Sequence, residues 1–263
     1  MSKYKPASAF TNACKVWKAL MLRESLSRLF ATRTSWLWLL AEPVFHLAYL
    51  MLIFSLLRVS SVGGSRTPLW ILTGLLTYFF FSHTSQQMAT AINANQALFA
   101  YRQIKPMDTL WVRGVLEFVL LGVIALLMYA GVWLFVDLSW PSDAFGILLA
   151  WTTAWVLGLG WGLVLSCVNE LLPDLGHVLK LLTMPMMLLS GVMLPLALVP
   201  PSLLDIVLLN PLVHVIESAR MGIHAHYHLV NGIQISYAMW WALSMLMVGL
   251  TLQRRFSYKL VAL

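Results

Sequence analysis

Three ionisable side chains lie within apolar stretches, where they would either carry out acid–base chemistry or form buried pairs. Glu42 and His46 are four residues apart, which places them on one face of a helix within reach of each other. Glu117 lies near the start of a later stretch. An enzyme acting inside the membrane, such as an acyl or glycosyl transferase, would gather its acid, base and nucleophile in one cluster, whereas these groups are scattered. We therefore favour a buried pair that stabilises helix packing, and we expect no catalytic residue.

The sequence shows no clear site for a metal or a nucleotide. His224, His226 and His228 alternate as metal-binding imidazoles can, but no carboxylate or cysteine accompanies them closely, so we expect ordinary loop histidines. The sequence also contains no Gly-x-x-x-x-Gly-Lys-Ser/Thr loop. Any nucleotide that powers this protein must therefore be bound by a partner, unless an ion gradient supplies the energy.

Six long apolar stretches position these groups. Hydrophobic residues make up 60% of the chain and charged residues only 10%, whereas about a quarter of a soluble domain is charged. Each stretch approaches the roughly 20 residues that a helix needs to cross the hydrocarbon layer, and helices satisfy their own backbone hydrogen bonds in lipid. The sequence thus predicts an all-α polytopic membrane protein with transmembrane helices over residues 36–57, 68–91, 115–136, 144–168, 179–199 and 233–252.

The basic residues are distributed unevenly about these spans. Following the chain through six crossings places 14 of the 17 Lys and Arg residues on one side, and only Arg58, Arg66 and Arg220 on the other. Because cytoplasmic loops are rich in Lys and Arg, both termini are predicted to be cytoplasmic. Residues 1–35 then form a cytoplasmic interface segment, and residues 36–263 form the transmembrane domain. The net charge of +7 suits anionic lipid headgroups rather than nucleic acid, since the charges flank the spans.

Residues 200–232 form the segment that fits this scheme least easily. Two short apolar pieces are separated by Asn210-Pro211, and neither can cross the membrane alone. A single crossing here would place the basic tail at Arg254 outside, against the charge bias. We therefore predict a re-entrant or interfacial helical pair on the outer side, before the last span.

The segment before the first span has two apolar stripes. Trp17 and Leu20 share one helical face, and Leu22 and Leu26 belong to a second stripe that is out of phase with the first. We expect an amphipathic segment in the membrane interface, with a bend or break near residues 21–22.

Polar and small residues mark the second and fourth spans. Ser82 and Gln86 belong to a cytoplasmic half of span two that is too polar to face lipid on all sides, so this half either packs among helices or lines a polar route. Gly158 and Gly162 form a small-residue face suited to close helix contact. We interpret Trp155 as a packing residue rather than as a flat face for sugar rings.

The loop over residues 92–113 connects spans two and three. A short helix beginning at Asn93 or Asn95 and ended by Lys105-Pro106 is predicted there. This helix would carry exposed aromatic side chains beside Arg102, a composition typical of protein-docking surfaces.

Several separated blocks of sequence carry a resemblance to a known family. The blocks are Ala94-Asn95-Gln96, Leu98-Phe99, Tyr101-Arg102 and residues 105–109 in the loop; Leu22-Arg23-Glu24, Arg28, Leu40-Ala41-Glu42-Pro43 and His46 around the first span; Pro173-Asp174; and residues 210–215 with Glu217 and Arg220. Together they resemble the permease subunit of ABC-type capsular polysaccharide exporters of Gram-negative bacteria, in the ABC-2-type permease family. The resemblance covers essentially the whole chain, and only residues 224–228 depart from it.

This resemblance implies a half-transporter of the bacterial inner membrane that forms a homodimer and binds two cytoplasmic ATPase subunits. The ATPase would hold ATP and Mg, so this chain needs no cofactor of its own. The substrate would be a lipid-linked polysaccharide, passed to a periplasmic co-polymerase and an outer-membrane export protein. The predicted ATPase-coupling residues are Asn95, Gln96, Leu98, Phe99, Tyr101, Arg102, Lys105, Pro106, Arg23, Glu24, Arg28, Pro173 and Asp174.

We predict that spans one, two and five of both protomers form the walls of the translocation path, with residues 200–232 narrowing its outer end. ATP-driven closure of the partner would push on the loop and the N-terminal helix and rock the dimer between two states. The candidate path residues are Glu42, His46, Tyr78, Ser82, Gln86, Glu117, Trp155, Asn210, His214, Glu217 and Arg220.

One alternative stays open within transport, and a second is disfavoured. A sister permease for an O-antigen or teichoic-type polymer would carry the same features, and the sequence does not separate these polymers. A secondary transporter would usually show inverted internal repeats, which we do not find in the sequence.

Overall fold

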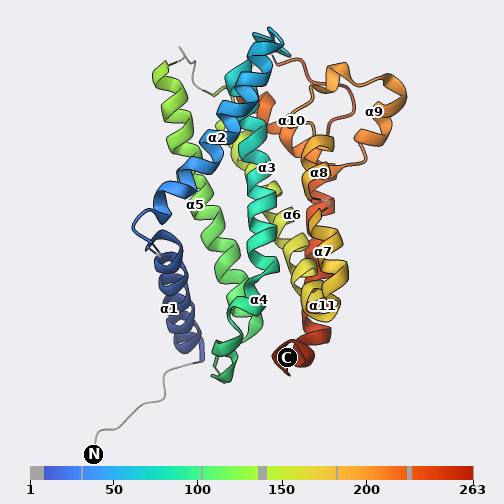
Figure 1. Cartoon of the computed structure of the whole chain (residues 1–263). Helices are drawn as coiled ribbons and strands as arrows, with labels where there is room; N and C mark the ends of the chain where they lie inside the picture. Colours follow the sequence, from blue (N-terminus) through green and yellow to red (C-terminus); the bar gives the residue numbers. More distant parts are fainter. Residues whose placement is uncertain are drawn as a thin grey trace, which may run out of the picture.

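The protein is almost entirely helical. The computed structural model describes residues 9–30, 32–101, 103–135, 141–181, 183–223 and 227–262. Long helices run side by side through the molecule (Figure 1). In chain order the elements are α1 (Ala9–Phe30), α2 (Ser35–Leu56), β1 (Ser61–Val62), β2 (Ser65–Arg66), α3 (Thr67–Ala89), α4 (Ala91–Ala94), η1 (Gln96–Ala100), α5 (Pro106–Phe135), α6 (Ala144–Leu171), α7 (Pro173–Leu181), α8 (Thr183–Leu189), η2 (Leu196–Leu198), α9 (Pro201–Val207), α10 (Pro211–Ile223) and α11 (Ile235–Ala262).

Within the described residues, four helices are long and apolar enough to cross a membrane. These are α2, α5, α6 and α11. Helices α9 and α10 are bent by 99° relative to each other and would add a fifth crossing if the pair formed one span. Large apolar side chains such as Phe45, Leu126 and Trp240 are exposed on the long helices, as expected for surfaces that face lipid. The chain is therefore a multi-pass membrane protein with four or five candidate spans.

Helix α3 forms the centre of the bundle. It packs against α2, α5, α6 and α10, and its side chains are buried along nearly its whole length. Ser82, Thr84 and Ser85 are among the buried residues, whereas Gln86 is exposed. Most of the polar half of this helix is thus covered by other helices, and a hydrogen bond from the Ser85 hydroxyl to the Ser82 backbone oxygen at 2.9 Å offsets part of the cost of burying these groups.

Glycines let α6 lie close to two neighbours. A Cβ atom on Gly158 would come within 2.7 Å of the Phe81 backbone oxygen in α3, and one on Gly160 within 2.6 Å of the Leu246 nitrogen in α11. Gly162 similarly faces Met88 and Ser85. The prediction of a close-contact face at Gly158 and Gly162 is confirmed, and Gly160 adds a second face.

Two predicted helices differ from those in the structure. A single helix over residues 179–199 is wrong: α7 begins at Pro173, α8 ends at Leu189, and a turn follows in which Gly191 has a φ of +77°. Helix α1 is uninterrupted from Ala9 to Phe30, so the break predicted near residues 21–22 is also wrong. One helix accommodates both apolar stripes because they face different surroundings: Leu20 of the first stripe is buried, whereas Leu22 and Leu26 of the second are exposed.

Most of the short elements lie at one of the two ends of the bundle. Helix α1, α4, η1 and the end of α11 lie at one end, which we call the α1 end; the β1–β2 hairpin, α9 and α10 lie at the other, which we call the hairpin end (Figure 1). The hairpin turns through Gly63 and Gly64, both with positive φ, as a two-residue turn requires. This hairpin is absent from our all-α prediction.

Candidate functional site

Helix α1 turns Glu24 and Arg28 toward the bundle, while several of its large apolar side chains face away from it. Glu24 is only 7% exposed, whereas Leu22 and Phe30 are 59% and 67% exposed. The helix packs against α5 and α2. Because a buried carboxylate is costly unless it is paired, this orientation requires basic partners on the neighbouring helices.

Two arginines and two glutamates of α1 and α5 pair with one another. Arg113 Nε lies 2.7 Å from Glu24 Oε1, and Arg28 Nε lies 3.5 Å from the same oxygen. Arg28 also donates to the carboxylate of Glu117. Each of the four side chains is at most 12% exposed. We call Glu24, Arg28, Arg113 and Glu117 the charge cluster; its two cations and two anions compensate each other.

Helix α3 completes the hydrogen bonding of the charge cluster. Arg28 Nη2 donates to Gln87 Oε1 at 3.0 Å. Arg113 Nη1 donates to the Gln87 backbone oxygen at 3.1 Å and to Thr90 Oγ1 at 3.2 Å. The last turn of α3 is therefore held by both arginines, so movement of α1 or α5 acts directly on this helix end.

His83 extends these contacts to α2. Its Nδ1 lies 3.7 Å from Glu117 Oε1, and its Nε2 lies 3.4 Å from Glu42 Oε1. His46 instead contacts the backbone oxygen of Glu42, at 2.9 Å from Nδ1. The predicted pair between the Glu42 and His46 side chains is thus not formed. Instead, α3 places the imidazole of His83 between the carboxylates of Glu42 and Glu117.

Arg23 joins α1 to the loop after α3. Its guanidinium donates to Asn95 Oδ1, and Asn95 Nδ2 donates to the Ala91 backbone oxygen at 2.8 Å. Asn95 is 3% exposed and makes no side-chain capping bond, contrary to the predicted role as a helix cap. Further along, Trp17 Nε1 donates to Asp108 Oδ1 at 2.9 Å.

The predicted docking helix is a single 3₁₀ turn, η1, which ends at Ala100 rather than at Lys105. Phe99 is half-buried against the cluster of apolar residues that includes Leu110, and Leu98 is also half-buried. Tyr101 is 66% exposed, and Gln96 is exposed as well. Arg102 lies outside the described residues. The exposed part of this surface is therefore centred on Tyr101.

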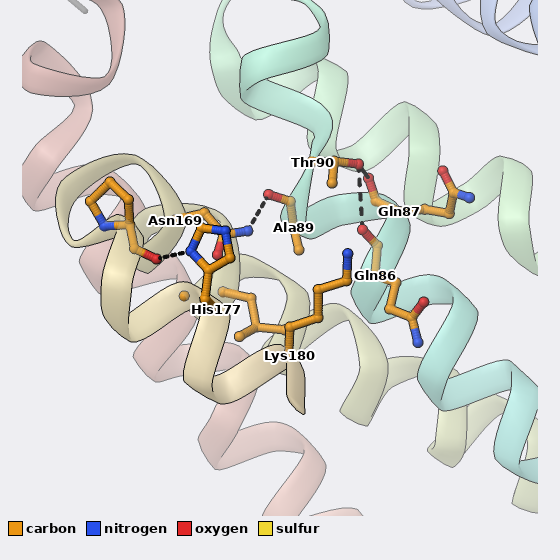
Figure 2. A pocket seen from close by; sticks show the side chains of 10 residues that line it. Gln86, Gln87, Ala89, Thr90, Asn169, His177 and Lys180 are labelled. Atoms are coloured by element: carbon orange, nitrogen blue, oxygen red, sulfur yellow. Dashed lines mark hydrogen bonds between the residues drawn. The ribbon is translucent and has the colours of Figure 1, made fainter. Parts of the chain in front are cut away.

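The other predicted coupling residues lie nearby in sequence or at the same end. Lys105 is exposed, and Pro106 is buried as the first residue of α5. Pro173 and Asp174 are exposed at the start of α7. Pro173 and Gln86 line the same groove between α3, α6 and α7 (Figure 2).

The aromatic path candidates are packing residues of the bundle. Trp155 Nε1 donates to the Gly114 backbone oxygen at 2.7 Å, and its ring lies 4.9 Å from that of Phe118. Tyr78 is buried, with its ring 6.2 Å from Phe81. These contacts fit the packing role that we expected of Trp155.

Glu217 and Arg220 lie at the hairpin end, in the interior. Arg220 is 2% exposed, pairs with Glu217 at 2.7 Å and donates to the backbone oxygens of Trp70, Gly191 and Val192 at 3.3, 2.9 and 3.2 Å. Its guanidinium also lies 3.6 Å from the centre of the Trp70 indole. This one side chain therefore connects α10, α3 and the turn after α8.

Tyr227 completes the surroundings of Glu217. Its hydroxyl donates to Glu217 Oε2 at 2.9 Å and accepts from Trp70 Nε1 at 3.0 Å. Burial raises the pKa of Tyr227 to about 12, and the negative charge of Glu217 adds to that rise. The phenol is therefore neutral at physiological pH and can serve as a donor.

His214 and Asn210 hold the junction of α9, α10 and α11. His214 Nδ1 accepts from the Gln234 backbone N–H at 3.0 Å, so its Nε2 is the donor to the Leu208 backbone oxygen at 2.7 Å. Asn210 Oδ1 accepts from the Leu212 backbone N–H at 3.0 Å. The path candidates within residues 210–220 therefore lie at the hairpin end (Figure 1), whereas Glu42 and Glu117 belong to the contacts around His83.

Sequence reasoning missed several members of these sites. Arg113, His83 and Gln87 were not singled out as site residues, although they join the charge cluster. Their spacing carries a signal: α1, α3 and α5 each present polar side chains at i and i+4, which share one helix face. Trp70 and Tyr227 carry no comparable signal, because their contacts join distant segments.

No group of three His, Cys, Asp or Glu side chains suited to a metal occurs among the described residues. His224 and His226 lie outside them.

Comparison with known proteins identifies the family. The family described as ABC-2 type transporter matches residues 15–224. This chain belongs to the ABC-2 type transporter family. The ABC-2 match covers α2 to α10, together with the charge cluster and the Arg220–Glu217 pair.

Curated relatives of this ABC-2 transporter chain are similar over most of their length. The polysialic acid transport protein KpsM of Escherichia coli is 33% identical over 90% of this chain and 92% of its own length. The capsule polysaccharide export inner-membrane protein CtrC of Neisseria meningitidis is 29% identical over 79% of this chain and 78% of its own. The capsule polysaccharide export inner-membrane protein BexB of Haemophilus influenzae is 23% identical over 92% of this chain and 91% of its own length.

Proposed function

We propose that this chain is the permease half of an ATP-driven exporter that moves lipid-anchored capsular polysaccharide across the bacterial inner membrane. The names of three groups of relatives, with coverage of the whole bundle, support this assignment. The chain is a non-catalytic transporter subunit, and a separate ATPase supplies the energy. Two copies of each subunit form the exporter, which passes its substrate to periplasmic and outer-membrane partners.

The observation that carries the mechanism is a line of contacts from Asn95 to Arg23, from Arg23 to Glu24 of the charge cluster at 3.9 Å, and from the cluster through His83 to Glu42. Buried ionic contacts resist separation, so the loop, α1, α5, α3 and α2 are coupled mechanically. An ATPase seated on Tyr101 and the exposed face of η1 would move this unit when it closes. The motion would reach the first span through His83 and Glu42.

We infer six crossings, made by α2, α3, α5, α6, the α7–α8 pair and α11, with α9 and α10 as a re-entrant pair. The location of α1, η1 and the end of α11 at one end of the bundle supports an even number of crossings (Figure 1). That end also carries most of the basic residues, which supports a cytoplasmic location for it and for both termini.

The test is complementation in encapsulated cells that lack their own permease. Cells that receive this chain with its ATPase should display polysaccharide at the surface, and cells that receive it with an ATPase unable to hydrolyse ATP should accumulate polysaccharide inside. Export that continues without any nucleotide-hydrolysing partner would contradict the proposal, as would failure of the two subunits to co-purify.

A further inference from the structure

The groove between α3, α6 and α7 is a candidate binding site at the α1 end. It has a volume of about 370 Å³, within the range of roughly 300–1,000 Å³ for small-ligand sites. Its polar walls come from the end of α3, the end of α6 and α7, and Figure 2 shows Lys180 extending toward the last turn of α3. The polar lining residues are Gln86, Gln87, Thr90, Asn169, His177 and Lys180.

Charge in this groove has one sign. Among the described residues that line it, Lys180 is the only one that is always charged at neutral pH, and none of them is a carboxylate. Within the described part of the chain Lys180 forms no ion pair, in contrast to the buried arginines of the charge cluster. A lone cation beside a groove whose walls carry both polar and apolar groups favours an anionic ligand.

The neighbouring side chains offer hydrogen bonds suited to hydroxyl groups. No hydrogen bond of the Gln86 amide with another described residue is present, so its donor and acceptor groups are available. Asn169 donates to the Ala89 backbone oxygen at 2.9 Å, which leaves its carbonyl oxygen as an acceptor. Ala89, Leu165 and Gly176 add small apolar contacts on the wall. Amides, a cation and small apolar patches together match a sugar unit that carries a carboxylate or phosphate.

The groove and the charge cluster lie against the same helix end. Gln87 and Thr90 line the groove, and they also accept hydrogen bonds from Arg28 and Arg113 respectively. A ligand that orders this turn of α3 therefore acts on the contacts that join α1 and α5.

We propose that this groove binds an acidic sugar unit or linking phosphate of the polysaccharide before transport, with Lys180 as the anion contact and Gln86 as the hydroxyl contact. The inference rests on the proposed function. Occupancy of the groove would report the presence of substrate to the charge cluster and raise ATP hydrolysis.

Photo-crosslinking in cells distinguishes the polysaccharide from a phospholipid headgroup, which shares the phosphate chemistry. A benzophenone side chain at His177 faces the groove, while one at Leu175 lies on another side of α7 and serves as the matched control. With a radiolabelled sugar supplied, we expect a labelled, slow-migrating adduct at position 177 only, and only in cells that synthesise polysaccharide. Phospholipid adducts alone, or no glycan adduct, would overturn the proposal.

Charge variants provide a second, independent measurement. At equal membrane abundance, Lys180→Gln should lower surface polysaccharide roughly tenfold, the size of effect expected for a lost charge-assisted hydrogen bond. Lys180→Arg should retain export, and Lys259→Gln, a basic residue of α11 outside the groove, should have no effect. Substrate-stimulated ATP hydrolysis should fall in Lys180→Gln while basal hydrolysis stays unchanged.

The results separate this inference from the proposed function. If the wild-type chain exports no polysaccharide with its ATPase, the proposed function is wrong. If the wild type exports and Lys180→Gln exports equally well, only the groove assignment is wrong.

Discussion

Arg113 of α5 lies 2.7 Å from the carboxylate of Glu24 in α1, and both side chains are almost fully removed from solvent. An ion pair in this setting fixes one helix against the other, since separating the partners leaves a charge without compensation. The pair explains why Glu24 of α1 is buried while Leu22 and Leu26 of the same helix remain exposed.

Glu24→Gln should therefore destabilise the protein by about 3 kcal/mol, because Arg28 and Arg113 lose their shared carboxylate. Thermal unfolding of the purified protein in detergent measures this effect. Lys15→Gln is the matched control: it removes a charge from an exposed position of the same helix and should leave stability unchanged within about 0.5 kcal/mol. Equal melting temperatures for Glu24→Gln and wild type would show that the pair contributes nothing.

Tyr101→Ala should weaken binding of the ATPase without affecting folding. Exposed aromatic side chains at the centre of an interface commonly contribute about 2 kcal/mol or more, which corresponds to a loss of affinity of more than tenfold. Titration of the ATPase onto reconstituted permease measures the affinity. Tyr258→Ala removes a 90% exposed tyrosine of α11 and should bind normally. Unchanged affinity for Tyr101→Ala would place the docking surface elsewhere.

Gly74→Ala should disturb the Arg220 site at the hairpin end. A Cβ atom at this position would clash with Arg220 Nη2, so the guanidinium must shift from its present position. We expect a loss of about 3 kcal/mol, as for other disrupted buried ion pairs. Gly131→Ala in α5 has no atom within 4 Å of the added carbon and should instead be neutral or stabilise the helix by up to about 1 kcal/mol. The comparison of the two melting temperatures checks the prediction, which requires that only Gly74→Ala unfolds earlier.

Tyr227 should make the stability of the folded protein depend on pH in the alkaline range. Burial raises its pKa from 10.0 to about 12, so the folded protein holds this proton more tightly than the unfolded chain does. The associated stabilisation is complete below pH 10 and is lost as the pH rises toward 12. Wild type should therefore be more stable than Tyr227→Phe at pH 8, and the difference in melting temperature should shrink between pH 10 and 12. A difference that stays constant over this range would contradict the assignment.

Much of the secondary structure follows from local patterns. Apolar stretches of about 20 residues predict spans without reference to other segments, because lipid selects for helices with apolar surfaces. Four of the six predicted spans correspond to helices that are long and apolar enough to cross a membrane, namely α2, α5, α6 and α11, and a fifth corresponds to the long central helix α3. The prediction over residues 179–199 is wrong because apolarity alone does not indicate where a helix yields to a turn such as that at Gly191.

The site illustrates the limit of local patterns. Spacing at i and i+4 correctly places Glu42 and His46 on one side of a helix, but the partner of the Glu42 carboxylate is His83 from α3. The stripes of α1 likewise indicate a helix, which is present over Ala9–Phe30, yet Glu24 and Arg28 face inward because Arg113 and Glu117 of α5 are there to receive them.

The sequence by itself determined that this is a helical membrane protein of several spans, and its separated motifs correctly indicated the ABC-2 family. Composition, charge bias and short motifs are properties of neighbouring residues, so they can be read without coordinates. Only the tertiary structure decided which charges meet, which helix end both arginines hold and where a groove remains open beside Lys180. Those features depend on residues up to 150 positions apart, such as Arg220 and Trp70, which come together only through helix packing.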